Sequence, residues 1–129
     1  MTRADYEKLP KPENGMWLTE MQTMADELNE MFTKIDQGVL PDPNPDKLME
    51  GLIEKAGEAL NKIDRPDDLD FLYYTYWACM EECEMWEATT REKKEELRSE
   101  GMLRTQVLVA WLFAIKRRID LLGGKIEVA

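Results

Sequence analysis

Apolar residues along the chain recur at the three- and four-residue steps of helices, and one stretch is apolar on every side. From Val107 to Ile115 every residue is apolar. On a helix, such a run is typical of burial on several sides. It is too short for a bilayer span, which needs about twenty residues, and it ends in three basic residues, 116–118. Residues 102–122 are therefore predicted to form the central helix of a bundle.

Three earlier segments carry an apolar stripe on one side only, which is typical of helices that pack against a core. They run near residues 17–37, 46–64 and 67–99. Prolines at 41, 43 and 45 separate the first two segments, because proline lacks the N–H that a helix interior needs. Asp46 is expected to cap the second helix.

The third predicted helix has two alternative ends. Its sequence after residue 86 is almost wholly polar, and paired charges three and four apart can keep such a stretch helical in water. Thr89 and Glu92 also have the spacing of a capping box, so a break near residues 88–90 is the alternative. Residues 99–101 are expected to turn the chain into the central helix.

Glycines occur both inside and after the predicted helices. Gly51 and Gly57 lie inside the second helix, where each costs about 1 kcal/mol relative to alanine. Close approach of a neighbouring helix would offset that cost. Gly38 and the pair Gly123-Gly124 follow helices and are natural stops.

Four helices with short loops predict an all-α fold, an antiparallel helical bundle with a buried C-terminal helix. The single domain is expected to span residues 16–124. Residues 1–15 are expected to form a flexible N-terminal tail, and residues 125–129 a C-terminal tail. The start of the chain has no apolar signal core, so a cytoplasmic location is expected.

The chain is acidic and contains no histidine. It has 27 acidic and 17 basic residues and a net charge of −10. Nucleic acid repels such a chain overall, so direct binding to nucleic acid is not expected, and neither is binding to a membrane. The absence of histidine removes the commonest general base and the commonest transition-metal ligand. No catalytic residue, cofactor or metal is assigned.

Two patterns, one of thiols and one of carboxylates, have features of metal sites. Cys79 and Cys83 share one helical face, but no third cysteine completes a ligand set, and buried cysteine acting as a small hydrophobe is favoured. Pairs of glutamates with ExxE spacing place two carboxylates on one face, where they could hold magnesium. These pairs are Glu27 and Glu30, Glu84 and Glu87, and Glu92 and Glu95. The spacing resembles that of all-α nucleotide pyrophosphohydrolases, but the ExxD that follows in that family is missing here.

Charge is distributed unevenly along the chain. Residues 1–70 contain 17 acidic and eight basic residues, a net charge of −9, whereas residues 102–125 contain five basic residues and one acidic residue, a net charge of +4. Cations are favoured at a helix C-terminus, which accounts for Lys116, Arg117 and Arg118. Pairing with acids of the first two helices is a further explanation.

One face of the third helix combines aromatic and acidic side chains. It consists of Asp70, Tyr74, Trp77, Glu81 and Glu84. Large aromatic residues give much contact area at low entropy cost, and the acids around them would select a basic partner. The alternative interpretation is that Tyr74 and Trp77 fill a second core contact.

Three hypotheses about function follow from these patterns. The favoured one is a non-catalytic acidic adaptor or inhibitor that binds a basic surface of a partner protein, for example one that normally binds nucleic acid. Small acidic phage proteins that disarm host nucleases are similar in composition only. The second hypothesis is an assembly subunit that self-associates, for instance as a homodimer, through its apolar helices. The third is a magnesium-dependent hydrolase that uses paired glutamates.

Overall fold

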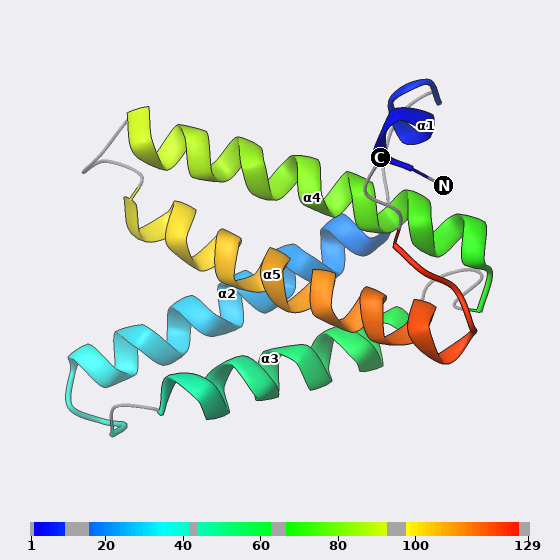
Figure 1. Cartoon of the computed structure of the whole chain (residues 1–129). Helices are drawn as coiled ribbons and strands as arrows, with labels where there is room; N and C mark the ends of the chain where they lie inside the picture. The colour runs from blue at the N-terminus through cyan, green and yellow to red at the C-terminus, as the bar shows by residue number, and fades with distance from the viewer. Residues whose placement is uncertain (1, 10–15, 42–43, 63–66, 93–97, 127–129) are drawn as a thin grey trace.

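The computed structural model of the chain describes residues 2–9, 16–41, 44–62, 67–92 and 98–126. These residues form five α-helices and no β-strand (Figure 1). In chain order, the helices are α1 (Arg3–Glu7), α2 (Met16–Asp36), α3 (Pro45–Leu60), α4 (Leu69–Glu92) and α5 (Arg98–Leu121). The all-α prediction is therefore confirmed.

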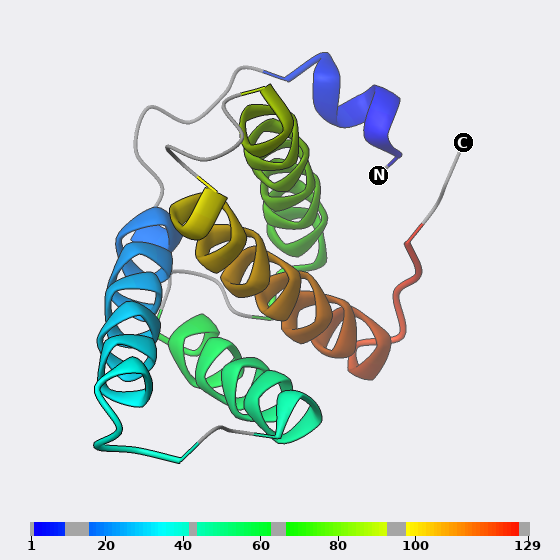
Figure 2. The same ribbon diagram turned by 90° about the vertical axis from the view of Figure 1, so that its left-hand side faces the viewer.

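Helix α5 lies at the centre of the bundle, with α4 on one side and the α2–α3 pair on the other (Figures 1 and 2). Its contacts are most extensive with α4 and continue onto α3 and α2. This arrangement confirms the prediction that the C-terminal helix is buried and packs against the other three long helices.

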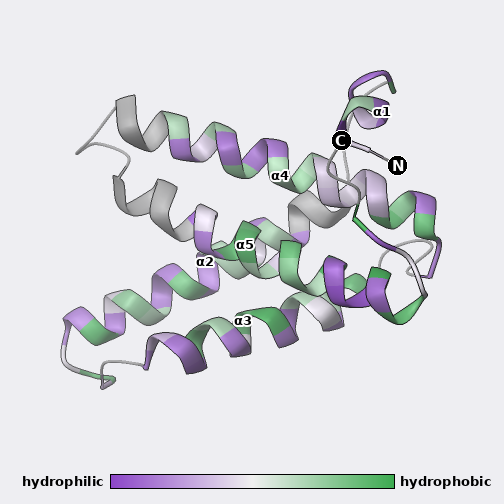
Figure 3. Ribbon diagram, viewed as in Figure 1, coloured by the Kyte–Doolittle hydropathy of each residue, from purple (hydrophilic) through white to green (hydrophobic). Residues whose placement is uncertain are grey.

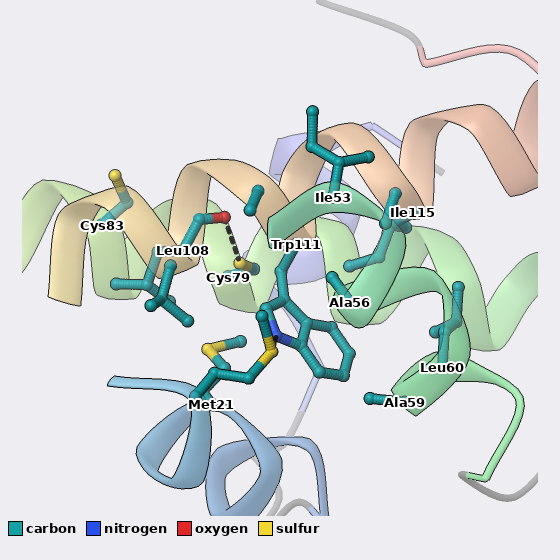
Figure 4. Packing of buried hydrophobic residues seen from close by; sticks show 14 of the residues in the cluster. Met21, Ile53, Ala56, Ala59, Leu60, Cys79, Cys83, Leu108, Trp111 and Ile115 are labelled. Atoms are coloured by element: carbon teal, nitrogen blue, oxygen red, sulfur yellow. Dashed lines mark hydrogen bonds between the residues drawn. The ribbon is translucent and has the colours of Figure 1, made fainter. Parts of the chain in front are cut away.

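Trp111 fills the centre of the core. Its side chain is fully buried, and the indole lies near Met21 of α2 and Ala56 of α3 (Figure 4). The indole N–H donates to the sulfur of Met24 at 3.3 Å. The neighbouring α5 residues Val107, Leu108 and Ile115 are buried as well.

The apolar run of α5 is buried on several sides, as predicted, by its contacts with α2, α3 and α4, but its remaining side is partly exposed. Phe113 is 49% exposed and Leu112 is half-buried. One side of α5 therefore faces away from the other helices, and hydrophobic and polar residues both occur along it (Figure 3). Within the described residues, no helix has the length and apolar character to cross a membrane.

Helix α3 begins earlier than expected. Asn44, and not Asp46, caps it: the Asn44 side-chain oxygen accepts hydrogen bonds from the backbone N–H groups of Asp46 and Lys47, at 2.9 and 3.4 Å. Pro45 takes the first helical position, where its missing N–H needs no partner. The helix ends at Leu60, so the predicted end at residue 64 is too late.

The junction between α4 and α5 also differs from the prediction. Helix α4 continues through residues 88–90 to Glu92, so the alternative break does not occur there. Residues 99–101 are already helical in α5, so the turn expected at these positions is wrong. One glycine inside a helix costs only about 1 kcal/mol, and packing of α5 on α4 offsets a cost of that size.

The glycine stops are confirmed. Gly38 and Gly123 adopt positive φ angles of 75° and 81°, which only glycine adopts without strain. Gly124 meets α4 closely, because a Cβ at this position would lie 2.5 Å from the hydroxyl oxygen of Tyr73. The backbone N–H of Lys125 donates to the same oxygen at 2.9 Å, which fastens the end of the described chain to α4.

Candidate interaction surface

The five residues predicted to form a binding face all lie on α4, and they are buried to different degrees. Asp70 and Glu84 are exposed, Tyr74 and Glu81 are half-buried, and Trp77 is only 5% exposed. Trp77 belongs to the hydrophobic core, and Tyr74 packs against that core. Both aromatic residues thus occupy the positions that the core interpretation predicted. These five residues are called the α4 face below.

Helix α1 lies against the α4 face. Tyr6 of α1 is 3% exposed, and its ring makes an edge-to-face contact with Tyr74, with the centroids 5.1 Å apart and the planes at 63°. Arg3 donates two hydrogen bonds to the carboxylate of Glu84, at 2.7 and 2.6 Å. An arginine and an aromatic residue of α1 therefore contact an acid and an aromatic residue of α4.

The ion pair between Arg3 and Glu84 is reflected in their pKa values. The hydrogen bond from Arg3 lowers the pKa of the Glu84 carboxyl. The hydrogen bond to Glu84 raises the pKa of Arg3, and the negative charges of Glu84, Glu7 and Glu81 raise it further. Because the two side chains remain 36% and 48% exposed, water screens the pair, which contributes at most about 1 kcal/mol to stability.

Helix α1 carries its own capping box. The Thr2 hydroxyl oxygen accepts from the backbone N–H of Asp5 at 3.2 Å, and the Thr2 N–H donates to the Asp5 carboxylate at 3.1 Å. The hydrogen bond from the Thr2 backbone N–H lowers the pKa of the Asp5 carboxyl, and a hydrogen bond with the Thr2 side chain lowers it further. A five-residue helix is far too short to be stable alone in water. Capping and contact with α4 together therefore hold α1 in place.

The sequence contains two signals of α1 that the assignment of residues 1–15 to a tail overlooked. Thr2 and Asp5 have capping-box spacing, and Arg3 and Tyr6 are three residues apart, which places them on one side of a helix. Neither signal shows what α1 packs against, because Arg3 and Glu84 are separated by 81 residues.

The cysteines are buried and free, as the hydrophobe interpretation predicted. Cys79 is fully buried and Cys83 is 5% exposed. The Cys79 thiol donates to the backbone carbonyl of Leu108 at 3.4 Å (Figure 4). Desolvation raises the pKa of both thiols, well above the ordinary value for Cys79.

One glutamate of each of two ExxE pairs forms an ion pair with a basic side chain. Glu84 binds Arg3, and the Glu27 carboxylate lies 3.4 Å from the ammonium of Lys55. The pair Glu92 and Glu95 falls outside the described side chains. Across the described part of the chain, no group of three or more cysteine, aspartate or glutamate side chains is placed to hold a metal ion.

The basic cluster near the end of α5 divides into two parts. Lys116 and Arg117 are exposed. Arg118 is partly buried and donates to Asn61, which follows α3, and to Asp67, which precedes α4. It therefore ties α5 to the connection between α3 and α4.

No family model, no curated protein and no solved structure matches this chain.

Proposed function

We propose that the protein is a non-catalytic, acidic helical interaction module that binds a basic surface of a partner protein through the α4 face, with Asp70, Tyr74, Glu81 and Glu84 in contact with the partner and Trp77 in the core. The docking of α1 is the observation that supports this proposal. Arg3 and Tyr6 pair with Glu84 and Tyr74, which is the chemistry expected of a basic partner with an aromatic anchor. In the absence of a partner, α1 covers the α4 face, and a segment of the partner displaces α1 when it binds.

The charges of the chain favour this kind of partner. The net charge of −10 attracts a basic surface during diffusional encounter, and Glu81 and Glu84 stand where the partner would arrive. Complementary rim charges mainly raise the association rate. A protein that binds nucleic acid carries a suitable basic surface, and covering that surface would make this chain its inhibitor or adaptor.

A partner competes with α1 for the α4 face, and this competition sets the apparent affinity of the partner for the protein. Because α1 belongs to the same chain, its effective concentration at the face is on the order of millimolar, as for other short tethers. A partner binds only the fraction of molecules in which α1 has left the face, so its apparent affinity falls by that fraction. Weakening α1 should therefore strengthen partner binding.

A titration with a peptide of residues 1–9 tests the chemistry of the face. The full-length chain with Arg3→Ala and Tyr6→Ala is titrated and followed by NMR. We expect saturable shifts at Tyr74, Glu81 and Glu84, and weaker binding by the wild-type chain, whose own α1 competes.

Charge variants in the same Ala-substituted background provide the control. Glu84→Arg should abolish peptide binding, whereas Glu54→Arg, at an exposed position of α3, changes the net charge equally and should leave binding intact. Equal binding by both charge variants would refute the proposed face.

The partner itself can be captured from the native host with the wild-type chain and identified by mass spectrometry. The variant with Glu81→Lys and Glu84→Lys should associate with that partner more slowly, and the salt dependence of the rate should flatten. Unchanged association kinetics would place the partner on another face.

A further inference from the structure

A groove of about 260 Å³ opens between α2 and α3, near the connection that joins them. Both helices make more of their contacts with α5 than with each other, and they diverge in the view of Figure 2. The groove is lined by Met24, Glu27, Leu28 and Met31 of α2, and by Lys47, Leu48, Gly51, Leu52 and Lys55 of α3.

The floor of the groove is apolar and adaptable. Met24, Leu28 and Leu52 are buried, and Met31 and Leu48 are half-buried. Methionine side chains are flexible and polarizable, so they adjust to the shape of a bound apolar group. An apolar groove with a few polar groups at its edge is the usual form of a small-molecule site.

Gly51 is a second observation that points to a ligand. A glycine inside a helix is destabilising relative to alanine, and a close neighbour would offset this. No atom of the described chain lies within 4 Å of a Cβ built at this position, so the approach of another helix that the sequence suggested does not occur here. The absence of a side chain at Gly51 lets a ligand pass close to the backbone. Gly57 has equally open surroundings but does not line the groove, and nothing in the structure explains it.

The charges at the edge of the groove differ between its two ends. At one end, the ion pair between Lys55 and Glu27 crosses from α3 to α2, at 3.4 Å. At the other end, Lys47 has no ion-pair partner among the described residues. Asp46 and Glu50 are its neighbours on α3 but do not line the groove. The ammonium group of Lys47 beside the apolar groove suits a ligand with an anionic head and an apolar tail.

We propose that the groove binds a medium-chain fatty acid, with its carboxylate at Lys47 and its alkyl chain along the methionine and leucine floor past Gly51. A dry cavity of about 150 Å³ holds a molecule of benzene, so 260 Å³ has room for roughly ten carbons. Decanoate is therefore the probe. This site is separate from the α4 face and does not depend on the function proposed for that face.

Calorimetric titration of the full-length chain with decanoate, below the concentration at which it forms micelles, tests the proposal. We expect saturable binding of one decanoate per chain. Octanoate should bind more weakly, by about twofold to fourfold for each methylene lost. Absence of saturable binding would overturn the proposal.

Two glycine variants test the location. Gly51→Leu fills the groove and should reduce decanoate affinity tenfold or more, while circular dichroism and the midpoint of thermal unfolding show that the fold is kept. Gly57→Leu is the matched control, because it also adds a side chain to open space on α3, and it should bind decanoate normally. Equal binding by both variants would overturn the assignment.

A third variant tests the head group. Lys47→Glu should weaken decanoate binding by about threefold to tenfold but leave decanol binding unchanged, because decanol has no charge. An equal effect on both ligands would refute the role of Lys47. Sedimentation velocity supplies the remaining outcome: a dimer that Gly51→Leu dissociates would assign the groove to a second copy of the chain and overturn the fatty-acid proposal.

Discussion

Tyr6→Ala distinguishes whether α1 is a separable occupant of the α4 face or a fixed part of the core. Truncating a large aromatic residue in a rigid core lowers the free energy of unfolding by about 3–5 kcal/mol. Tyr6 is 3% exposed, so a loss of this size is expected if α1 cannot leave α4. If α1 can leave, the loss cannot exceed the free energy with which α1 docks.

The docking free energy of α1 is small. Burial of the Tyr6 ring contributes about 4–5 kcal/mol, for about 150–200 Å² at about 25 cal/mol per Å². The contact with Tyr74 and the exposed ion pair with Glu84 add about 1–2 kcal/mol. Ordering the five residues of α1 costs about 5 kcal/mol of backbone entropy at about 1 kcal/mol each. The net docking free energy from these contributions is therefore about 1–2 kcal/mol.

Urea denaturation of Tyr6→Ala, Arg3→Ala and the double variant measures the docking free energy of α1. We expect Tyr6→Ala to lower the free energy of unfolding by about 1–2 kcal/mol, and Arg3→Ala to add almost nothing to Tyr6→Ala, because α1 has then already left the face. Tyr6→Phe keeps the ring and its contact with Tyr74 and is the control, with a smaller loss than Tyr6→Ala. A loss of 3–5 kcal/mol for Tyr6→Ala, with an independent further loss for Arg3→Ala, would refute the idea that α1 is displaceable.

Four further outcomes are expected. Trp111→Ala should lower the free energy of unfolding by about 3–5 kcal/mol in the same urea assay, because the indole is fully buried. Because the pKa of Glu84 is depressed in the folded chain, its pairing with Arg3 stabilises the docked α1 above the ordinary pKa of 4.5 and is lost as pH falls through the folded value. The hydrogen-exchange protection factors of α1 should therefore fall on acidification below about 4.5, and Glu84→Gln should reduce this response but not remove it, because the Asp5 carboxylate of the capping box also has a lowered pKa. Cys79 should react with a thiol reagent at neutral pH only after unfolding, since burial raises its pKa and excludes the reagent; rapid reaction of the folded protein would contradict this. Incubation with nucleotides and Mg²⁺ or Mn²⁺ should release neither phosphate nor pyrophosphate, and a turnover that Glu84→Gln abolishes would revive the hydrolase hypothesis.

The spacing of apolar residues predicted the long helices, because the residues that each helix buries lie close together in the sequence. The stripes of α2, α3 and α4 repeat every three to four residues, and the apolar run of α5 marks the helix that contacts all three. Helix ends were predicted less well where composition is uniformly polar. Between residues 88 and 101 the only apolar residues are Ala88 and Leu97, so no stripe marks which side faces the core. A capping pattern at Thr89 and a glycine at 101 therefore suggested boundaries at positions that are helical in the structure.

The α4 face shows that sequence spacing identifies which residues share a side of a helix but not which distant residues contact them. Sequence spacing placed Tyr74, Trp77 and Glu84 on neighbouring turns of one helix and indicated the chemistry of whatever contacts them. It could not identify the contact, because Arg3 and Tyr6 lie far away in the chain and belong to a helix that is stable only when docked. The same dependence on docking is why we propose that α1 can be exchanged. A five-residue helix whose contacts with α4 include an aromatic pair and a screened ion pair gives way to a partner that offers more of both.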